Sequence, residues 1–218
     1  NSISGLTRDV RVANTYINGK LVDQNAPLSQ VMTLSEMKRN PESWQLDFSK
    51  RAKWTYSVGT ELDAMLNVAD RYGDDKIAAY VISYVDTLVN QDGSITGYKT
   101  EHYNLDQVKN GTLLLQAYDR TGEERYLKAA HTLWNQLKSQ PRTADGGYWH
   151  KQIYPHQMWL DGLFMAEPFS AKYANRFLTG KEKEDAWNHI ADQFIVVAKH
   201  TYDPATGLYR HAWDESKE

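Results

Sequence analysis

The sequence predicts an all-α fold, a toroid built from helical hairpins. The first observation is an apolar pattern at i, i+4, i+7, i+8 and i+11 that occurs three times, and this spacing is one face of an amphipathic helix. The second is that the helices between these copies are apolar on more than one face, as buried helices are. No stretch of the chain is convincing as a β-strand.

The three copies of the pattern follow Gly73, Gly122 and Gly180. Their apolar positions are Ile77, Val81, Tyr84, Val85 and Leu88, then Tyr126, Ala130, Leu133, Trp134 and Leu137, then Trp187, Ala191, Phe194, Ile195 and Ala198. The first two copies are 49 residues apart and the last two are 61 apart. A glycine-aromatic loop follows each copy, at 91–98, 143–150 and 203–211. We expect three outer helices, each with one buried face.

The other expected helices complete the hairpins. They lie near 27–39, 55–71, 106–120 and 157–176, so the chain holds about seven helices. Hairpins that repeat every 50 to 60 residues either stack into an open α-solenoid or close into a toroid. Alternation of buried and amphipathic helices favours two concentric rings. We expect an N-terminal extension at 1–25 and an α/α-barrel domain at 26–218 that is incomplete at its C-terminus and belongs to a longer chain.

Composition excludes several classes of function. With 25 Lys and Arg against 28 Asp and Glu, the net charge is −3 and no long run has one sign, so neither nucleic acid nor an acidic membrane is an expected partner. The absence of cysteine excludes disulfides and thiolate metal sites. No apolar run is long enough to span a bilayer. The 7 Trp and 14 Tyr suit either a large helical core or a groove that stacks on sugars.

The toroid brings the N-termini of its inner helices to one mouth. This arrangement gathers one set of side chains around a single cavity: Trp54, Tyr56, Asp106, Trp159 and Asp161, with His150 and His211 in adjoining loops. Helix N-termini favour anions, and aromatic rings offer stacking surfaces. The pattern therefore predicts a pocket for an acidic sugar or a similar small molecule.

Asp161 is the strongest candidate for chemistry. It is expected several residues inside the helix 157–176, among apolar neighbours and with no basic residue within a helical turn. It is therefore either a catalytic acid or a structural acid whose hydrogen bonds are satisfied.

Asp106 is either a second acid or an N-cap. His150 and His211 are single histidines in loops, and the sequence alone favours a structural role for each of them. A metal site from these four residues lacks a close ligand spacing, and we expect no metal. Two neighbouring acids suit acid/base chemistry on sugars.

Several segments resemble the unsaturated rhamnogalacturonyl hydrolases of glycoside hydrolase family 105, which are related to the family 88 unsaturated glucuronyl hydrolases. They are "KWTYSVG", "YNLDQVKNG", "GGYWHK", "MWLDGLFMAEPF" and "TGLYRHAWDESK", and the resemblance covers residues 30 to 218. It implies an (α/α)6 barrel that hydrates the C4=C5 double bond of an unsaturated uronic acid at the non-reducing end of lyase-generated oligosaccharides, without metal or cofactor.

The resemblance also implies roles for individual residues. Asp161 matches the general acid/base, and Asp106 matches the second acid, which binds ring hydroxyls and tunes Asp161. Residues that match or extend the wall of the sugar site are His150, Trp159, His211, Trp54, Tyr56 and Trp213. The expected partner is a small oligosaccharide, the oligomeric state is not predicted, and periplasmic and cytoplasmic locations are both compatible with this activity.

Three alternatives stay open from the sequence. An unsaturated glucuronyl hydrolase shares the unsaturated ring, so the segment around Asp161 does not separate it. A helical-repeat binding or scaffold protein would not need a carboxylate at Asp161, so that alternative leaves this residue unexplained. Another α/α-toroid enzyme, such as a sugar epimerase, typically works with histidine pairs, whereas here the inner helices offer acids.

Overall fold

The computed structural model describes residues 16–17, 20–21 and 26–217, and the predicted extension at 1–25 falls largely outside this part. Its helices are α1 (Leu28–Arg39), α2 (Tyr56–Tyr72), α3 (Asp75–Leu88), α4 (Leu105–Val108), α5 (Gly111–Thr121), α6 (Glu124–Ser139), α7 (Gly162–Phe177) and α8 (Gly180–Thr201). Its short strands are β1 (Tyr16–Ile17), β2 (Lys20–Leu21), β3 (Gln157–Trp159), β4 (Tyr202–Asp203), β5 (Leu208–Tyr209) and β6 (Ala212–Asp214). The predicted all-α class is confirmed.

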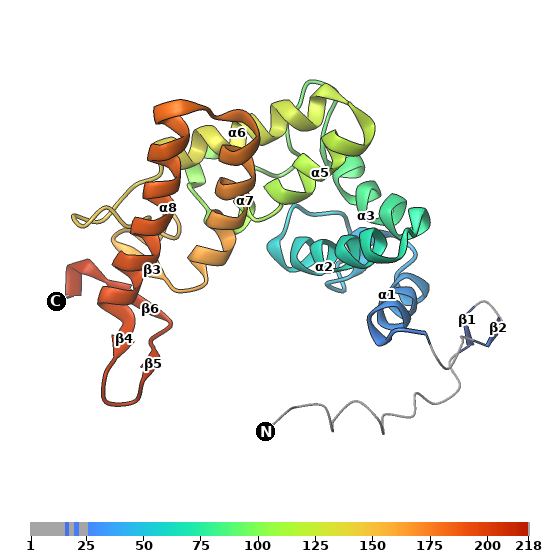
Figure 1. Ribbon diagram of the computed structural model, residues 1–218, viewed down its shortest axis with the longest axis horizontal. Helices are drawn as coiled ribbons and strands as arrows, with labels where there is room; N and C mark the ends of the chain where they lie inside the picture. The colour runs from blue at the N-terminus through green and yellow to red at the C-terminus, as the bar shows by residue number, and fades with distance from the viewer. Residues whose placement is uncertain (1–15, 18–19, 22–25, 218) are drawn as a thin grey trace.

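The helices pack as successive hairpins, α2 with α3, α5 with α6 and α7 with α8. Each new hairpin places its first helix against the preceding one, because α5 contacts both α2 and α3 and α7 contacts both α5 and α6. Figure 1 shows α1 and α8 at opposite ends of the resulting arrangement. The hairpin repeat read from the sequence is therefore present in the structure.

Two of the pattern's glycines end a helix and turn the chain. Gly73 follows α2 with φ 65° and Gly122 follows α5 with φ 72°, which is the left-handed conformation that glycine adopts without a steric penalty. Gly180 differs, since it is the first residue of α8 instead of the end of α7. The third copy of the repeat therefore begins differently from the first two.

The predicted buried face holds for two copies and is wrong for the third. All five positions of the first copy are buried on α3, and four of the five are buried on α6. On α8 the buried residues are instead Ile190, Gln193, Val197 and Thr201. The predicted positions Trp187, Phe194 and Ile195 are 44%, 50% and 64% exposed. The third copy is therefore an apolar face, as the pattern indicates, but it is not a buried one, because no described element covers it.

The helix predicted at 106–120 is two helices, α4 and α5, with a break at Lys109 and Asn110. Polar contacts to α2 hold the break. Lys109 forms an ion pair with Asp63, and the Asn110 amide donates to the Thr55 carbonyl at 3.0 Å. Gly59 makes room for Asn110, since a Cβ at Gly59 would lie 1.6 Å from the amide oxygen.

The helix predicted at 157–176 starts five residues later, at Gly162. The preceding residues form β3, which pairs antiparallel with β6, so the prediction of no strand is wrong here. The β3–β6 ribbon brings the C-terminal segment against the start of α7 (Figure 1). Strands of two or three residues are too short for the alternation of apolar and polar residues to identify them.

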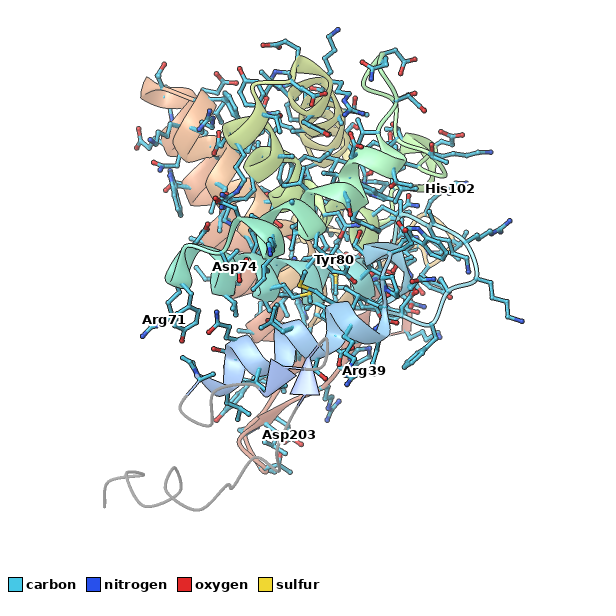
Figure 2. All side chains as sticks on the ribbon, turned by 90° about the vertical axis from the view of Figure 1, so that its right-hand side faces the viewer. Arg39, Arg71, Asp74, Tyr80, His102 and Asp203 are labelled. Atoms are coloured by element: carbon cyan, nitrogen blue, oxygen red, sulfur yellow. The ribbon has the colours of Figure 1, made fainter. Side chains whose placement is uncertain are left out.

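At the other end, α1 contacts α2 and α3. The Tyr80 hydroxyl of α3 donates to the Asn40 carbonyl at 2.7 Å, next to Arg39 at the end of α1 (Figure 2). No helix among the described residues combines the length and the apolar character that crossing a membrane requires.

Candidate active site

Asp106, His150 and Asp161 come together from three separate segments. One nitrogen or oxygen atom of each lies within 4.8 Å of those of the other two. Asp106 lies in the first turn of α4, His150 in the loop after α6, and Asp161 directly before α7. The convergence predicted from the toroid therefore holds for these three residues.

Asp106 accepts two hydrogen bonds from cationic or potentially cationic groups. His150 Nε2 lies 2.9 Å from Oδ1, and Lys151 Nζ lies 2.6 Å from Oδ2. Burial alone would raise the pKa of Asp106, but the hydrogen bonds and charges of His150 and Lys151 outweigh it and hold the pKa below its ordinary value. The site therefore contains one acid that stays ionised.

The alternative role of Asp106 as an N-cap is wrong. Asn104 is the N-cap of α4, and its side-chain oxygen accepts the backbone N–H of Asp106 at 3.0 Å. Since Asn104 caps the helix, the carboxylate of Asp106 is free to point at His150 and Lys151.

Backbone and ring contacts fix the position of His150, which is only 1% exposed. Its N–H donates to the Gln157 carbonyl at 2.8 Å, and its carbonyl accepts the Leu105 N–H at 3.0 Å. Its ring stacks on the indole of Trp159, with centroids 4.4 Å apart and planes 8° apart. Gly162 leaves space beside the ring, because a Cβ there would approach His150 Nδ1 to 3.2 Å.

Asp161 occupies the N-cap position of α7 and not the interior of a helix, which corrects the prediction. Its side chain makes no capping hydrogen bond. Oδ1 is buried and has no hydrogen-bond partner among the described residues, and the same is true of His150 Nδ1. Buried polar atoms are nearly always paired, so two unpaired atoms in one cluster mark a place where a ligand or water binds.

Aromatic side chains form one wall beside this cluster. Trp159 stacks on Tyr154 at 5.3 Å between centroids and lies 5.4 Å from the tilted ring of His211. Lys151 Nζ lies 5.7 Å from the centre of the Trp159 ring. Sequence reasoning missed Tyr154 and Lys151. Lys151 follows His150 directly in "GGYWHK", so its position in that motif was the signal available.

The surroundings of the other three predicted site residues differ from one another. Trp54 is 5% exposed in the core, where its Nε1 donates to the Gln107 carbonyl at 2.8 Å. Tyr56 is 43% exposed at the first position of α2. Trp213 pairs with the buried Met158 across the β3–β6 ribbon, so its side chain is on the face opposite Trp159, and its ring stacks on His200 at 3.7 Å.

The cluster of two carboxylates and an imidazole has the donor atoms of a cation site. One carboxylate is already partnered, however, because Lys151 supplies a positive charge to Asp106 Oδ2. The expected absence of a metal stays a prediction.

Comparisons with known proteins agree with this architecture. The model of the family described as Glycosyl Hydrolase Family 88 matches residues 28–218. An unsaturated rhamnogalacturonyl hydrolase, YesR of Bacillus subtilis (strain 168), is 28% identical over 185 residues, which is 81% of this chain and 48% of that protein. The chain therefore spans about half the length of this curated relative.

Solved structures give the same relationship. A family 105 glycoside hydrolase of C. acetobutylicum ATCC 824 is 40% identical with a TM-score of 0.78, over 87% of this chain and 50% of its own. A possible family 105 member from Klebsiella pneumoniae is 22% identical with a TM-score of 0.63, over 75% and 41%, which shows the shared fold. The resemblance stated from the sequence is confirmed, and the protein belongs to Glycosyl Hydrolase Family 88, with relatives of known structure in family 105.

Proposed function

We propose that the protein releases a 4,5-unsaturated galacturonic acid from the non-reducing end of rhamnogalacturonan oligosaccharides by hydrating the vinyl ether. The observation that carries the proposal is the meeting of Asp106, His150 and Asp161 beside the Trp159 ring. YesR, whose name states this class of activity, is similar over 81% of the chain.

Asp161 is the proposed proton carrier. Its protonated carboxyl donates a proton to C4, and the positive charge that develops at C5 and the ring oxygen is taken up by water attacking C5. The Asp161 carboxylate removes one proton from that water, so the acid is regenerated. The hemiketal at C5 opens, and the resulting hemiacetal at C1 releases the rest of the oligosaccharide as an alcohol. The buried, unpartnered Oδ1 of Asp161 suits a group whose partner is the substrate.

Asp106 has the complementary role in this proposal. Its lowered pKa keeps it ionised, so it stabilises positive charge at the reacting ring and accepts hydrogen bonds from ring hydroxyls. His150 and Lys151 fix its two oxygens, and Trp159 supplies a flat surface for the sugar. Trp54, Tyr56 and His211 stay proposed members of the sugar site, with His211 adjacent to Trp159. The sugar contact expected for Trp213 stays a prediction from the sequence, because its ring stacks on His200 on the opposite face of the ribbon.

The experiment that tests the reaction type is turnover in deuterium oxide. Hydration places one deuterium at C4 of the released sugar, whereas direct displacement at C1 leaves C4 unlabelled and the double bond intact. Proton NMR of the product distinguishes the two, with the finished product incubated separately as a control for later exchange. An unsaturated glucuronyl disaccharide assayed in parallel decides between the two substrate classes.

A further inference from the structure

The helix that carries Asp106 is too short to hold its own orientation. α4 has four residues, Leu105–Val108, whereas isolated helices shorter than about 12 residues are marginal in water. Its direction therefore depends on contacts that other segments make with its two ends. At the first end, the Asn104 side chain caps the helix and the Leu105 N–H donates to the His150 carbonyl at 3.0 Å. These contacts fix the start of α4, and the end of α4 has an anchor of its own.

Lys109 provides that anchor. It directly follows α4, is 1% exposed, and its ammonium forms an ion pair with Asp63 of α2. Asp63 Oδ2 also accepts a hydrogen bond from the Thr112 hydroxyl of α5 at 2.7 Å. The Asp63 carboxylate thus binds both the end of α4 and the start of α5. Since Asp63 belongs to a helix of 17 residues, it gives α4 a fixed point of attachment.

The same ammonium group faces the start of α7. Lys109 Nζ lies 5.2 Å from the centre of the Phe164 ring, within the range of an attractive cation–π contact. Phe164 follows Asp161 by three positions in the chain, and α4 packs against both α2 and α7. Lys109 therefore lies where the segment that carries Asp106 meets the segment that carries Asp161.

A buried lysine is a costly way to fill space. Removing an ammonium and a carboxylate from water costs free energy that their attraction repays only in good geometry, and apolar residues of similar volume often give equal or greater stability. What an ion pair adds is direction, because the ammonium is satisfied only where its carboxylate lies. The burial of Lys109 three residues after Asp106 is therefore better explained by positioning than by stability.

We propose that Lys109 is a positioning residue for the two acids of the candidate site. Its ion pair with Asp63 holds the Asp106 carboxylate within reach of its cationic partners, and its contact with Phe164 fixes α4 against the start of α7. Lys109 thus acts through Asp106 and not on the sugar. The consequence for catalysis rests on the proposed function, whereas the placement of Asp106 does not.

The test is the pKa of Asp106, measured from the pH dependence of its carboxyl carbon NMR signal, with Asp106→Asn used to assign the signal. Asp63→Asn separates positioning from charge. Loss of a negative charge alone would lower this pKa, whereas a displaced Asp106 loses the contacts that hold its pKa down, so we expect a rise of about 0.5–1. A fall or no change in the folded variant overturns the proposal.

A variant without either charge covers the case in which Asp63→Asn does not fold because the buried ammonium has lost its carboxylate. In Lys109→Met with Asp63→Asn both charges are absent, so the net charge of the chain is unchanged and neither member of the pair is left as a buried charge. The pKa of Asp106 should again rise by about 0.5–1. A pKa equal to that of wild type contradicts the proposal.

Arg125 and Asp86 supply a matched control. Arg125 is also a buried cation, 8% exposed, and it pairs with Asp86, but this pair joins α6 to α3. In the described part of the chain, no hydrogen bond or ion pair of these two residues reaches the candidate site. Arg125→Met with Asp86→Asn should leave the pKa of Asp106 unchanged. An equal rise in the two double variants would indicate a general loosening of the fold and contradict the proposal.

Steady-state kinetics on the unsaturated disaccharide measure the catalytic consequence. Because a misplacement of 1 Å can slow a reaction about 10²-fold, we expect kcat of Lys109→Met with Asp63→Asn to fall about 10- to 100-fold. The change in KM should be smaller, since Trp159 still offers its ring to the sugar. Full kcat in this variant overturns the inference and leaves the proposed function intact. A wild-type chain that does not hydrate the double bond contradicts the proposed function, while the NMR titration still decides the inference.

Discussion

His150 Nε2 lies 2.9 Å from Oδ1 of Asp106, although the two residues are 44 positions apart in the chain. This contact joins α4 to the loop that follows α6, and Lys151 reaches the second oxygen of the same carboxylate. Burial, two hydrogen bonds and one fixed positive charge thus act on Asp106 together, and its lowered pKa is the net result.

Lys151→Met tests the electrostatic role of the lysine. Loss of the ammonium removes a group that lowers the pKa of Asp106, so this pKa should rise toward its ordinary value. If catalysis requires ionised Asp106, the acidic limb of the pH profile of kcat/KM should move to higher pH in this variant. Lys50→Met, at an exposed lysine, is the control and should leave the profile in place. An acidic limb that does not move in Lys151→Met would show that Asp106 does not set it.

Asp106→Asn should lower the free energy of unfolding by about 1–3 kcal/mol near neutral pH, because the buried His150 and the partly exposed Lys151 lose a charged partner. A carboxyl whose folded pKa is lowered stabilises the fold above its unfolded pKa, near 4, and this contribution is lost as the pH falls through the folded pKa. The difference between wild type and variant should therefore shrink in acid. Urea unfolding from pH 3 to pH 7 measures it.

The control for that series is Asp185→Asn. Asp185 pairs with Lys181 on the exposed side of α8, and such surface pairs contribute about 0–1 kcal/mol. Equal losses in the two variants would mean that the Asp106 contacts add nothing specific to the fold.

Glu167→Gln should change how the stability of the chain alone depends on pH. Burial raises the pKa of Glu167 to about 8, against smaller opposing effects of Ser170 and Arg142. The folded chain thus holds a proton that the unfolded chain releases near pH 4, so the free energy of unfolding falls as the pH rises from about 4 to 8. The fall is up to roughly 4–5 kcal/mol at 1.4 kcal/mol per pKa unit. Urea unfolding should show a flatter dependence in the variant, and parallel curves would contradict the raised pKa.

Trp159→Ala and Trp213→Phe compare the two faces of the β3–β6 ribbon. Loss of the Trp159 ring should raise KM about 3- to 10-fold, since a stacked ring contributes about 0.5–1.5 kcal/mol. Trp213 faces His200, so Trp213→Phe should lower the melting temperature and leave KM within about twofold. Steady-state kinetics on an unsaturated disaccharide decide this. A comparable rise in KM for Trp213→Phe would support the sugar contact that the sequence predicted for it.

The sequence was sufficient for the parts of the fold that depend on long apolar periodicities. The hairpins and the five buried positions of α3 follow from the 3.6-residue pattern, which local physics determines. The break at Lys109 and the start of α7 at Gly162 were not predictable in this way. The break depends on the Asp63 side chain and the Thr55 carbonyl in another hairpin. The late start of α7 depends on pairing with a strand 55 residues farther along the chain.

The sequence predicted which residues form the candidate site better than it predicted the contacts between them. Asp106, His150 and Asp161 were candidates from the topology and the resemblance, and the structure brings them together. The pairing of Lys151 with Asp106 and the burial of Trp54 against Tyr84 are long-range packing outcomes that no local pattern encodes. The exposed face of α8 could not be foreseen either, because a periodicity identifies an apolar face but not whether a partner covers it.

The most direct test of the central claim is the activity of Asp161→Asn on an unsaturated rhamnogalacturonan disaccharide, followed by loss of the ultraviolet absorbance of the conjugated double bond. The amide has the same shape but cannot supply the proton, so we expect at least a ~10³-fold loss of kcat. Far-ultraviolet circular dichroism and the melting temperature should stay close to wild type, since no described residue bonds to Oδ1. Full activity in a folded Asp161→Asn protein would contradict the account.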